Sequence, residues 1–141
     1  MKAIINRSVP RSAVIPVLTY DDVGRASDWL CRAFGFRERL RIGDHRVQLV
    51  LGDGAVILTA GSLDTSPATV SHAVHVHVED ADRHHEQAKR AGARILQPPT
   101  DYPYGERQYG ALDLGGHHWT FSQSIADVDP ASWGATGFEP E

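Results

Sequence analysis

The sequence predicts an α+β fold made of two βαβββ modules, and three observations support this prediction. Two segments resemble each other at an offset of 58 residues, counted from Asp22 to Asp80, where acidic residues open a helical pattern. Each helical pattern has a basic last turn and stops at a glycine, Gly35 or Gly92. Each also follows a run rich in Val and Ile and precedes three short strand-like runs. Such a repeat predicts a symmetric scaffold whose pocket is lined by equivalent positions of both modules.

The first module begins with a strand predicted over 14–20, in which Pro16 marks an edge position. Asp21 or Asp22 caps the following helix, whose apolar residues form one stripe and which Gly35 ends in the left-handed conformation. Three strands follow, separated by Gly-Asp turns that are typical of hairpins. These strands are predicted over 36–42, 45–51 and 55–60, and a polar connector over 61–71.

The second module repeats this order, with a strand over 73–78 and a helix over about 81–91. Its other strands are predicted near 93–97, 107–113 and 117–122, with a loop rich in Pro and Tyr over 98–105. The modules, about 13–60 and 72–122, are expected to form a single domain over 1–123, followed by a C-terminal tail over 124–141. Trp133 and Phe138 are expected to anchor this tail.

The composition narrows the class of protein. The chain has 141 residues, 41% of them hydrophobic and 23% charged, which is an ordinary globular balance. A formal net charge of −4 with scattered Lys and Arg argues against a nucleic-acid partner. No apolar run approaches the roughly 20 residues that span a bilayer, and residues 1–7 lack the apolar core of a secretion signal. A single cysteine, Cys31, fits a reducing compartment, so we expect a cytoplasmic protein without a membrane partner.

Four stretches of the chain carry a family resemblance. They are Val78-Glu79-Asp80-Ala81-Asp82, Arg90-Ala91-Gly92-Ala93, Pro103-Tyr104-Gly105-Glu106-Arg107 and Asp113-Leu114-Gly115-Gly116-His117-His118-Trp119-Thr120-Phe121. Their order and spacing resemble the vicinal oxygen chelate superfamily of glyoxalase I, bleomycin-resistance proteins and extradiol dioxygenases. The bleomycin-resistance-like proteins are the most similar branch, and the resemblance covers about residues 13–123. It implies that each module curls into a half-barrel around a cavity, with helices outside, and that the protein is a homodimer.

The resemblance also implies where a catalytic relative would hold a divalent metal ion. Those ligands, His or Glu, lie on the first and fourth strands of each module. Counted from the helix caps and from Gly54 and Gly116, the four positions read Ile15, Leu58, Ala73 and Thr120. None of these side chains suits Zn, Fe or Mn, so we expect no metal, no cofactor and no catalytic residue. The last motif also departs from the usual Asp-Pro-acidic-Gly, since it reads Asp113-Leu114-Gly115-Gly116.

Strand alternation places further residues in the predicted cavity. The cavity-facing residues are expected to be Ile15, Val17, Val56, Leu58, Ala73, His75, His77, His118 and Thr120. Four aromatic residues either stack on a planar ligand or fasten the long loop and the tail: Tyr102, Tyr104, Tyr109 and Trp133. Arg107 either binds a ligand carboxylate or pairs with Glu106 or Asp101. His84 and His85 are expected to be solvated, and His117 to be structural.

Two functional hypotheses follow. The first is a non-catalytic protein that sequesters an aromatic or planar compound, perhaps an antibiotic, as bleomycin-resistance proteins do. The alternative is a metal-dependent lyase, isomerase or dioxygenase whose ligands have moved to His75, His77 and His118. A metal-free enzyme or a regulatory binding module is the remaining possibility. The ligand, and the pairing of the modules within one chain or between two, stay open.

Overall fold

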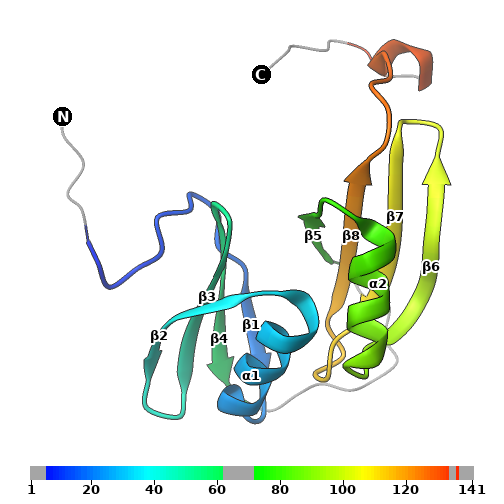
Figure 1. Cartoon of the computed structure of the whole chain (residues 1–141). Coiled ribbons are helices and arrows are strands. Elements are labelled where there is room, and N and C mark those ends of the chain that lie inside the picture. The colour runs from blue at the N-terminus through cyan, green and yellow to red at the C-terminus, as the bar shows by residue number, and fades with distance from the viewer. Residues whose placement is uncertain (1–5, 62–71, 134–135, 137–141) are drawn as a thin grey trace, which may run out of the picture. The chain divides into compact units, whose positions relative to one another are not determined.

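The computed structural model describes residues 6–61, 72–133 and 136, and it confirms the α+β fold. The chain divides into two compact units. Unit 1 takes in Met1–Thr69 and Leu114–His117, and unit 2 takes in Val70–Asp113 and His118–Glu141. Each unit has one α-helix lying against one face of a four-stranded sheet (Figure 1). The element order is the predicted βαβββ in both units.

Unit 1 has the sheet order β1-β4-β3-β2, with β1 parallel to β4 and the other pairs antiparallel. Its elements are β1 (Val17–Tyr20), α1 (Val23–Phe34), β2 (Arg37–Ile42), β3 (Arg46–Leu51) and β4 (Gly54–Ala60). As Pro16 predicted, β1 is an edge strand, and the Pro16 carbonyl accepts a hydrogen bond from the Ile57 amide at 2.9 Å. The predicted connector lies outside the described residues, apart from Gly61.

Unit 2 has the equivalent order β5-β8-β7-β6, with β5 parallel to β8. Its elements are β5 (Val74–His77), α2 (Ala81–Arg90), β6 (Arg94–Tyr102), β7 (Glu106–Leu112), β8 (His118–Ser124) and the short 3₁₀ helix η1 (Pro130–Trp133). The loop predicted over 98–105 is wrong for most of its length, because β6 continues to Tyr102. Pro98 and Pro99 fit because β6 is an edge strand whose register shifts between Gln97 and Thr100.

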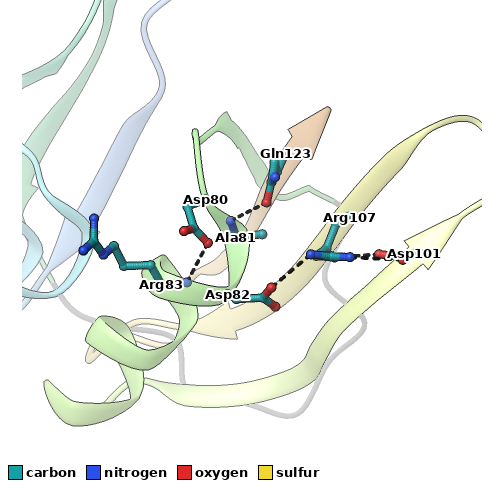
Figure 2. Close-up of polar contacts among 7 residues, drawn as sticks. All are labelled: Asp80, Ala81, Asp82, Arg83, Asp101, Arg107 and Gln123. Atoms are coloured by element: carbon teal, nitrogen blue, oxygen red, sulfur yellow. Dashed lines mark hydrogen bonds and ion pairs between the residues drawn. The ribbon is translucent and has the colours of Figure 1, made fainter. Parts of the chain in front are cut away.

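The helices begin and end at residues that the sequence singled out. The Asp22 carboxylate accepts a hydrogen bond from the Arg25 amide at 3.0 Å, and Asp80 accepts one from the Arg83 amide at 3.0 Å. At the end of α1, Gly35 has φ 85° and therefore takes the left-handed conformation that favours glycine. Figure 2 shows a further contact in α2, where the Gln123 side chain of β8 accepts from the Ala81 amide at 2.9 Å. This contact joins the start of α2 to its sheet.

The helix-covered face of each sheet forms a core. In unit 1 this face buries Leu18, Tyr20 and Leu58 beneath α1. In unit 2 it buries Trp119 and Phe121. These residues are apolar or aromatic and leave little exposed surface, so burial of this face supplies the main driving force for each unit.

Two histidines predicted to be solvated are partly buried instead. His84 and His85 of α2 lie against Tyr109, with ring centroids 5.7 Å and 5.3 Å from the tyrosine ring. His84 also shares a hydrogen bond with the Tyr109 hydroxyl. The short helix leans these rings onto β7, which the polar pattern of its sequence did not indicate. Neither of the described α-helices has the length and apolar character needed to cross a membrane.

Candidate functional site

The candidate site lies on the face of the unit 2 sheet opposite α2. The parallel pairing of β5 and β8 sets His75 beside Thr120 and His77 beside Ser122. The alternate residues, such as Trp119, point to the helix-covered face and are buried. His75 and His77 are exposed and Thr120 is half-buried, so the predicted faces of β5 and β8 agree with the register.

A chain of four polar side chains runs across this face. The Tyr104 hydroxyl donates to Gln108 Oε1 at 3.1 Å, and Gln108 Nε2 donates to Ser122 Oγ at 3.1 Å. Ser122 Oγ in turn donates to Glu106 Oε1 at 2.6 Å. Every donor in this chain points toward the Glu106 carboxylate, so the bonds polarise one another and hold the four groups in one geometry. We call Tyr102, Tyr104, Glu106, Gln108 and Ser122, with His75 and His77, the polar-aromatic face.

The aromatic part of this face is a pair of tyrosines. The Tyr102 and Tyr104 rings stack with centroids 5.4 Å apart and an interplanar angle of 11°. Tyr102 also accepts a hydrogen bond from Gln97 of the same strand. Both rings are half-buried, so they present flat apolar surface that is already ordered by its neighbours. A preordered flat surface suits a planar ligand because little side-chain entropy is lost on binding.

Glu106 is the charged group of the polar-aromatic face. Burial alone would raise the pKa of Glu106, but hydrogen bonds from Ser122 and Ser124 and the charges of His77 and His75 outweigh burial. The net effect lowers the pKa of Glu106 below its ordinary value. The carboxylate is therefore held ionised and acts as a hydrogen-bond acceptor.

Sequence reasoning missed the roles of Glu106, Gln108 and Ser122. It considered Glu106 only as a partner of Arg107 and did not single out the other two. Strand alternation contained the missing signal, because residues 106 and 108 share one face of β7, and 120 and 122 share one face of β8. The pairing of the two strands then brings Gln108 beside Ser122.

Two residues predicted to contact a ligand lie on the opposite face. Tyr109 pairs with Phe121, stacks on it with centroids 5.1 Å apart, and is buried. This burial raises the pKa of Tyr109. Arg107, two residues earlier, shares that face and binds Asp101 at 2.7 Å and Asp82 of α2 at 3.0 Å, as Figure 2 shows. The predicted pairing of Arg107 with Asp101 is thus the arrangement found, and Arg107 keeps the pKa of Asp101 below its usual range.

In unit 1 the register of β4 differs from the prediction. Leu58 pairs with Leu18 and is fully buried, so it lies on the face covered by α1, and Val56 shares that face. The residue beside Val17 is Ile57. Val17 and His75 each lie five residues before their helix cap, so Ile57, and not Leu58, is the counterpart of Thr120. The corrected position is again apolar.

The remaining predicted residues are placed more simply. Ile15 is half-buried and Ala73 is exposed, each just before the first strand of its unit, and His118 is half-buried on β8. The backbone of Trp133 belongs to η1, but its side chain and Phe138 lie outside the described residues. His117 is structural, as expected, because Nε2 donates to the Thr19 carbonyl at 2.8 Å within unit 1. Among the described residues, no group of three or more His, Cys, Asp or Glu is arranged to hold a metal ion.

Replacing Glu106 with glutamine is expected to lower the free energy of unfolding by about 1–2 kcal/mol at pH 7, because the bond from Ser122 then reaches a neutral acceptor. The pKa of Glu106 is lowered by folding, so its stabilisation is present above the ordinary pKa of 4.5 and is lost as pH falls through the lower folded value. The difference between wild type and variant should therefore shrink below pH 4.5 in urea denaturation. An equal difference at pH 7 and pH 3 would contradict this assignment, and Glu79→Gln at an exposed turn is the control.

Comparisons with known proteins agree with this architecture. Residues 13–121 match the family described as the Glyoxalase/Bleomycin resistance protein/Dioxygenase superfamily. The structure of TioX from Micromonospora sp. ML1 is similar, with 38% identity and a TM-score of 0.68, over 81% of this chain and 99% of that one. An uncharacterized protein of Mycobacterium bovis is 28% identical over 135 residues, which covers 83% of this chain and 86% of the relative.

The fold likeness extends to an antibiotic-resistance protein. The fosfomycin resistance protein FosX from Mesorhizobium loti superposes with a TM-score of 0.63 over 80% of this chain and 92% of that one. At 19% identity this similarity concerns the fold alone. The repeated βαβββ units, the sheet orders and the match over residues 13–121 together show that this chain belongs to the glyoxalase/bleomycin resistance protein/dioxygenase superfamily.

Proposed function

We propose that this protein binds a small, largely planar compound on its polar-aromatic face and sequesters it without catalysing a reaction. The observation that carries the proposal is the hydrogen-bonded chain from Tyr104 to Glu106 beside the stacked Tyr102 and Tyr104 rings. Flat apolar surface next to a few ordered polar groups is the usual composition of a small-molecule site. The rings supply contact area, and the polar chain supplies orientation.

The chemistry of the family's metal positions supports binding without turnover. Those positions carry Ile15, Ile57, Ala73 and Thr120, whose side chains are poor ligands for a transition metal ion. A relative that uses a metal to polarise its substrate needs imidazole or carboxylate groups there. Protection of a cell would then follow from mass action alone, as the ligand is removed from solution.

The class of ligand and the assembly are part of the same proposal. An aromatic or planar antibiotic fits the stacked tyrosines, and the family membership is consistent with such a ligand. We further expect a homodimer that acts in the cytoplasm, as the single cysteine and the family resemblance suggest.

Calorimetry and thermal shifts against a panel of aromatic and glycopeptide antibiotics test the proposal. At about a hundred times its dissociation constant, a ligand should stabilise the fold by roughly 2.7 kcal/mol. Tyr104→Ala should weaken binding about tenfold, because it removes both a stacking surface and the first donor of the polar chain. Ile125→Ala, an exposed apolar site just after β8, is the matched control.

The opposing result is also measurable. Protein purified without chelators should contain less than about 0.1 metal ion per chain if the metal positions are inert. Stoichiometric Fe, Mn, Ni or Zn with metal-dependent turnover, and no binder in the panel, would overturn sequestration in favour of an enzyme.

A further inference from the structure

The segment before β1 crosses one face of the unit 1 sheet. Gln48 Nε2 of β3 donates to the Ser8 carbonyl at 2.8 Å, and Arg39 Nη2 of β2 donates to the Arg7 carbonyl at 2.8 Å. Farther along, Ser12 Oγ donates to the Asp53 carbonyl at the turn between β3 and β4, at 2.6 Å. We call residues 7–12 the strap; in Figure 1 they belong to the blue segment that leads into β1.

The strap lies on the face opposite α1. Gln48 stands between Val47 and Leu49, which are both buried on the helix-covered face, so its side chain points to the other side. Nevertheless Gln48 is only 2% exposed. The strap therefore takes part in covering the face of unit 1 that corresponds to the polar-aromatic face of unit 2.

The groups beneath the strap form a small donor array for peptide carbonyls. Arg39 Nη1 donates to Gln48 Oε1 at 2.8 Å, which orients the amide so that its Nε2 group points to the strap. The second Arg39 nitrogen and Gln48 Nε2 then bind successive backbone carbonyls, those of Arg7 and Ser8. Backbone carbonyls carry no side-chain identity, so any extended compound with two neighbouring amide carbonyls offers the same acceptors.

The strap itself is loosely held. Arg7, Ser8 and Val9 are exposed, and Pro10 is the one strap residue that is buried. The printed contacts are hydrogen bonds between side chains and backbone, without strand pairing over residues 7–12. A segment that combines satisfied carbonyls with little apolar burial opens at low free-energy cost.

We infer that the Arg39–Gln48 face of unit 1 is a second binding site, for an amide-rich, peptide-like ligand, and that the strap occupies it in cis as a displaceable competitor. The occupied fraction of the strap reduces the affinity that a ligand in solution experiences. This site lies in unit 1, so its failure would leave the proposed function of unit 2 untouched, and the reverse also holds.

The test uses the strap sequence as the probe. A fluorescent peptide with the sequence of residues 6–12, blocked at both ends, is titrated into the full chain and into a variant that lacks residues 2–12. The shortened variant should bind the peptide at least tenfold more tightly than the full chain, since its face is vacated. Within the shortened variant, Gln48→Met keeps the volume but removes the donor, and should weaken binding about tenfold.

Gln108→Met is the matched control, because it makes the same chemical change on the unit 2 face and should leave peptide binding unchanged. Equal peptide affinity of the full and shortened chains, or equal affinity of the Gln48 and Gln108 variants, would overturn the inference.

A second measurement on the full chain covers the case in which the shortened variant does not fold. Trypsin cleaves after Arg7 and Arg11 only when the strap leaves the sheet. Gln48→Met should accelerate both cleavages at least fivefold relative to wild type and to Gln108→Met. Unchanged cleavage in the Gln48 variant would show that the strap is not held by this donor and would sink the proposal.

Discussion

Replacing Trp119 with alanine is expected to lower the free energy of unfolding by about 3–5 kcal/mol, the largest effect of any substitution proposed for this chain. Trp119 is 1% exposed and lies on the helix-covered face of the unit 2 sheet. Its ring is parallel to that of Phe121, with centroids 6.1 Å apart. Truncation would leave a large cavity in a core formed by one short helix and one sheet.

The indole nitrogen adds a polar term to this loss. Trp119 Nε1 donates to Asp113 Oδ2 at 3.0 Å, and Asp113 is itself buried. Trp119→Phe keeps most of the ring but deprives the carboxylate of this bond, so we expect a loss of about 1–3 kcal/mol. Urea denaturation followed by far-ultraviolet circular dichroism measures both variants. Equal losses for Trp119→Phe and Trp119→Ala would mean that the hydrogen bond, and not packing, dominates.

Leu58→Ala is expected to cost about 2–5 kcal/mol, whereas Val17→Ala should cost less than about 1 kcal/mol. Leu58 is fully buried on the α1 face, and Val17 is 55% exposed on the opposite face. The contrast follows from the register in which Leu58 pairs with Leu18, and Val17 with Ile57. The pair of variants therefore tests which face of β4 the helix covers.

The same register predicts how the positions respond to charge. Leu58→Asp should prevent folding, because an ionised carboxylate would be placed in the α1 core without a partner. Val17→Asp should remain folded, since its side chain reaches water. Circular dichroism and gel filtration distinguish the two results, and a folded Leu58→Asp would show that the register of β4 is wrong.

Local sequence signals predicted most of the fold. Asp22, Asp80 and Gly35 act on backbone groups within a few residues of themselves, so the helix ends followed from their chemistry. Glycine-rich turns between alternating strands predicted the hairpins in the same way. The predicted outward face of β5 and β8 was also obtained, because Val alternates with His on β5 and aromatic residues with polar ones on β8.

The sequence misplaced residues where the alternation carries no information. In β4 the run Ala55, Val56, Ile57 and Leu58 is buried on both sides, so its period does not reveal which face meets the helix. In β7 the positions of Arg107 and Tyr109 follow from the pairing of Tyr109 with Phe121, a partner in another strand. A shift of one residue reverses every side chain of a strand, which explains why whole strands were affected.

The sequence by itself determined the order of elements, their caps and turns, and the apolar character of Ile15 and Ala73, because these depend on a residue and its near neighbours. Only the tertiary structure decided that Glu106, Gln108 and Ser122 share one chain of hydrogen bonds and that the strap lies on Gln48. Those contacts join strands and segments far apart in the chain, so their register is set by packing across the sheet and not by local preference.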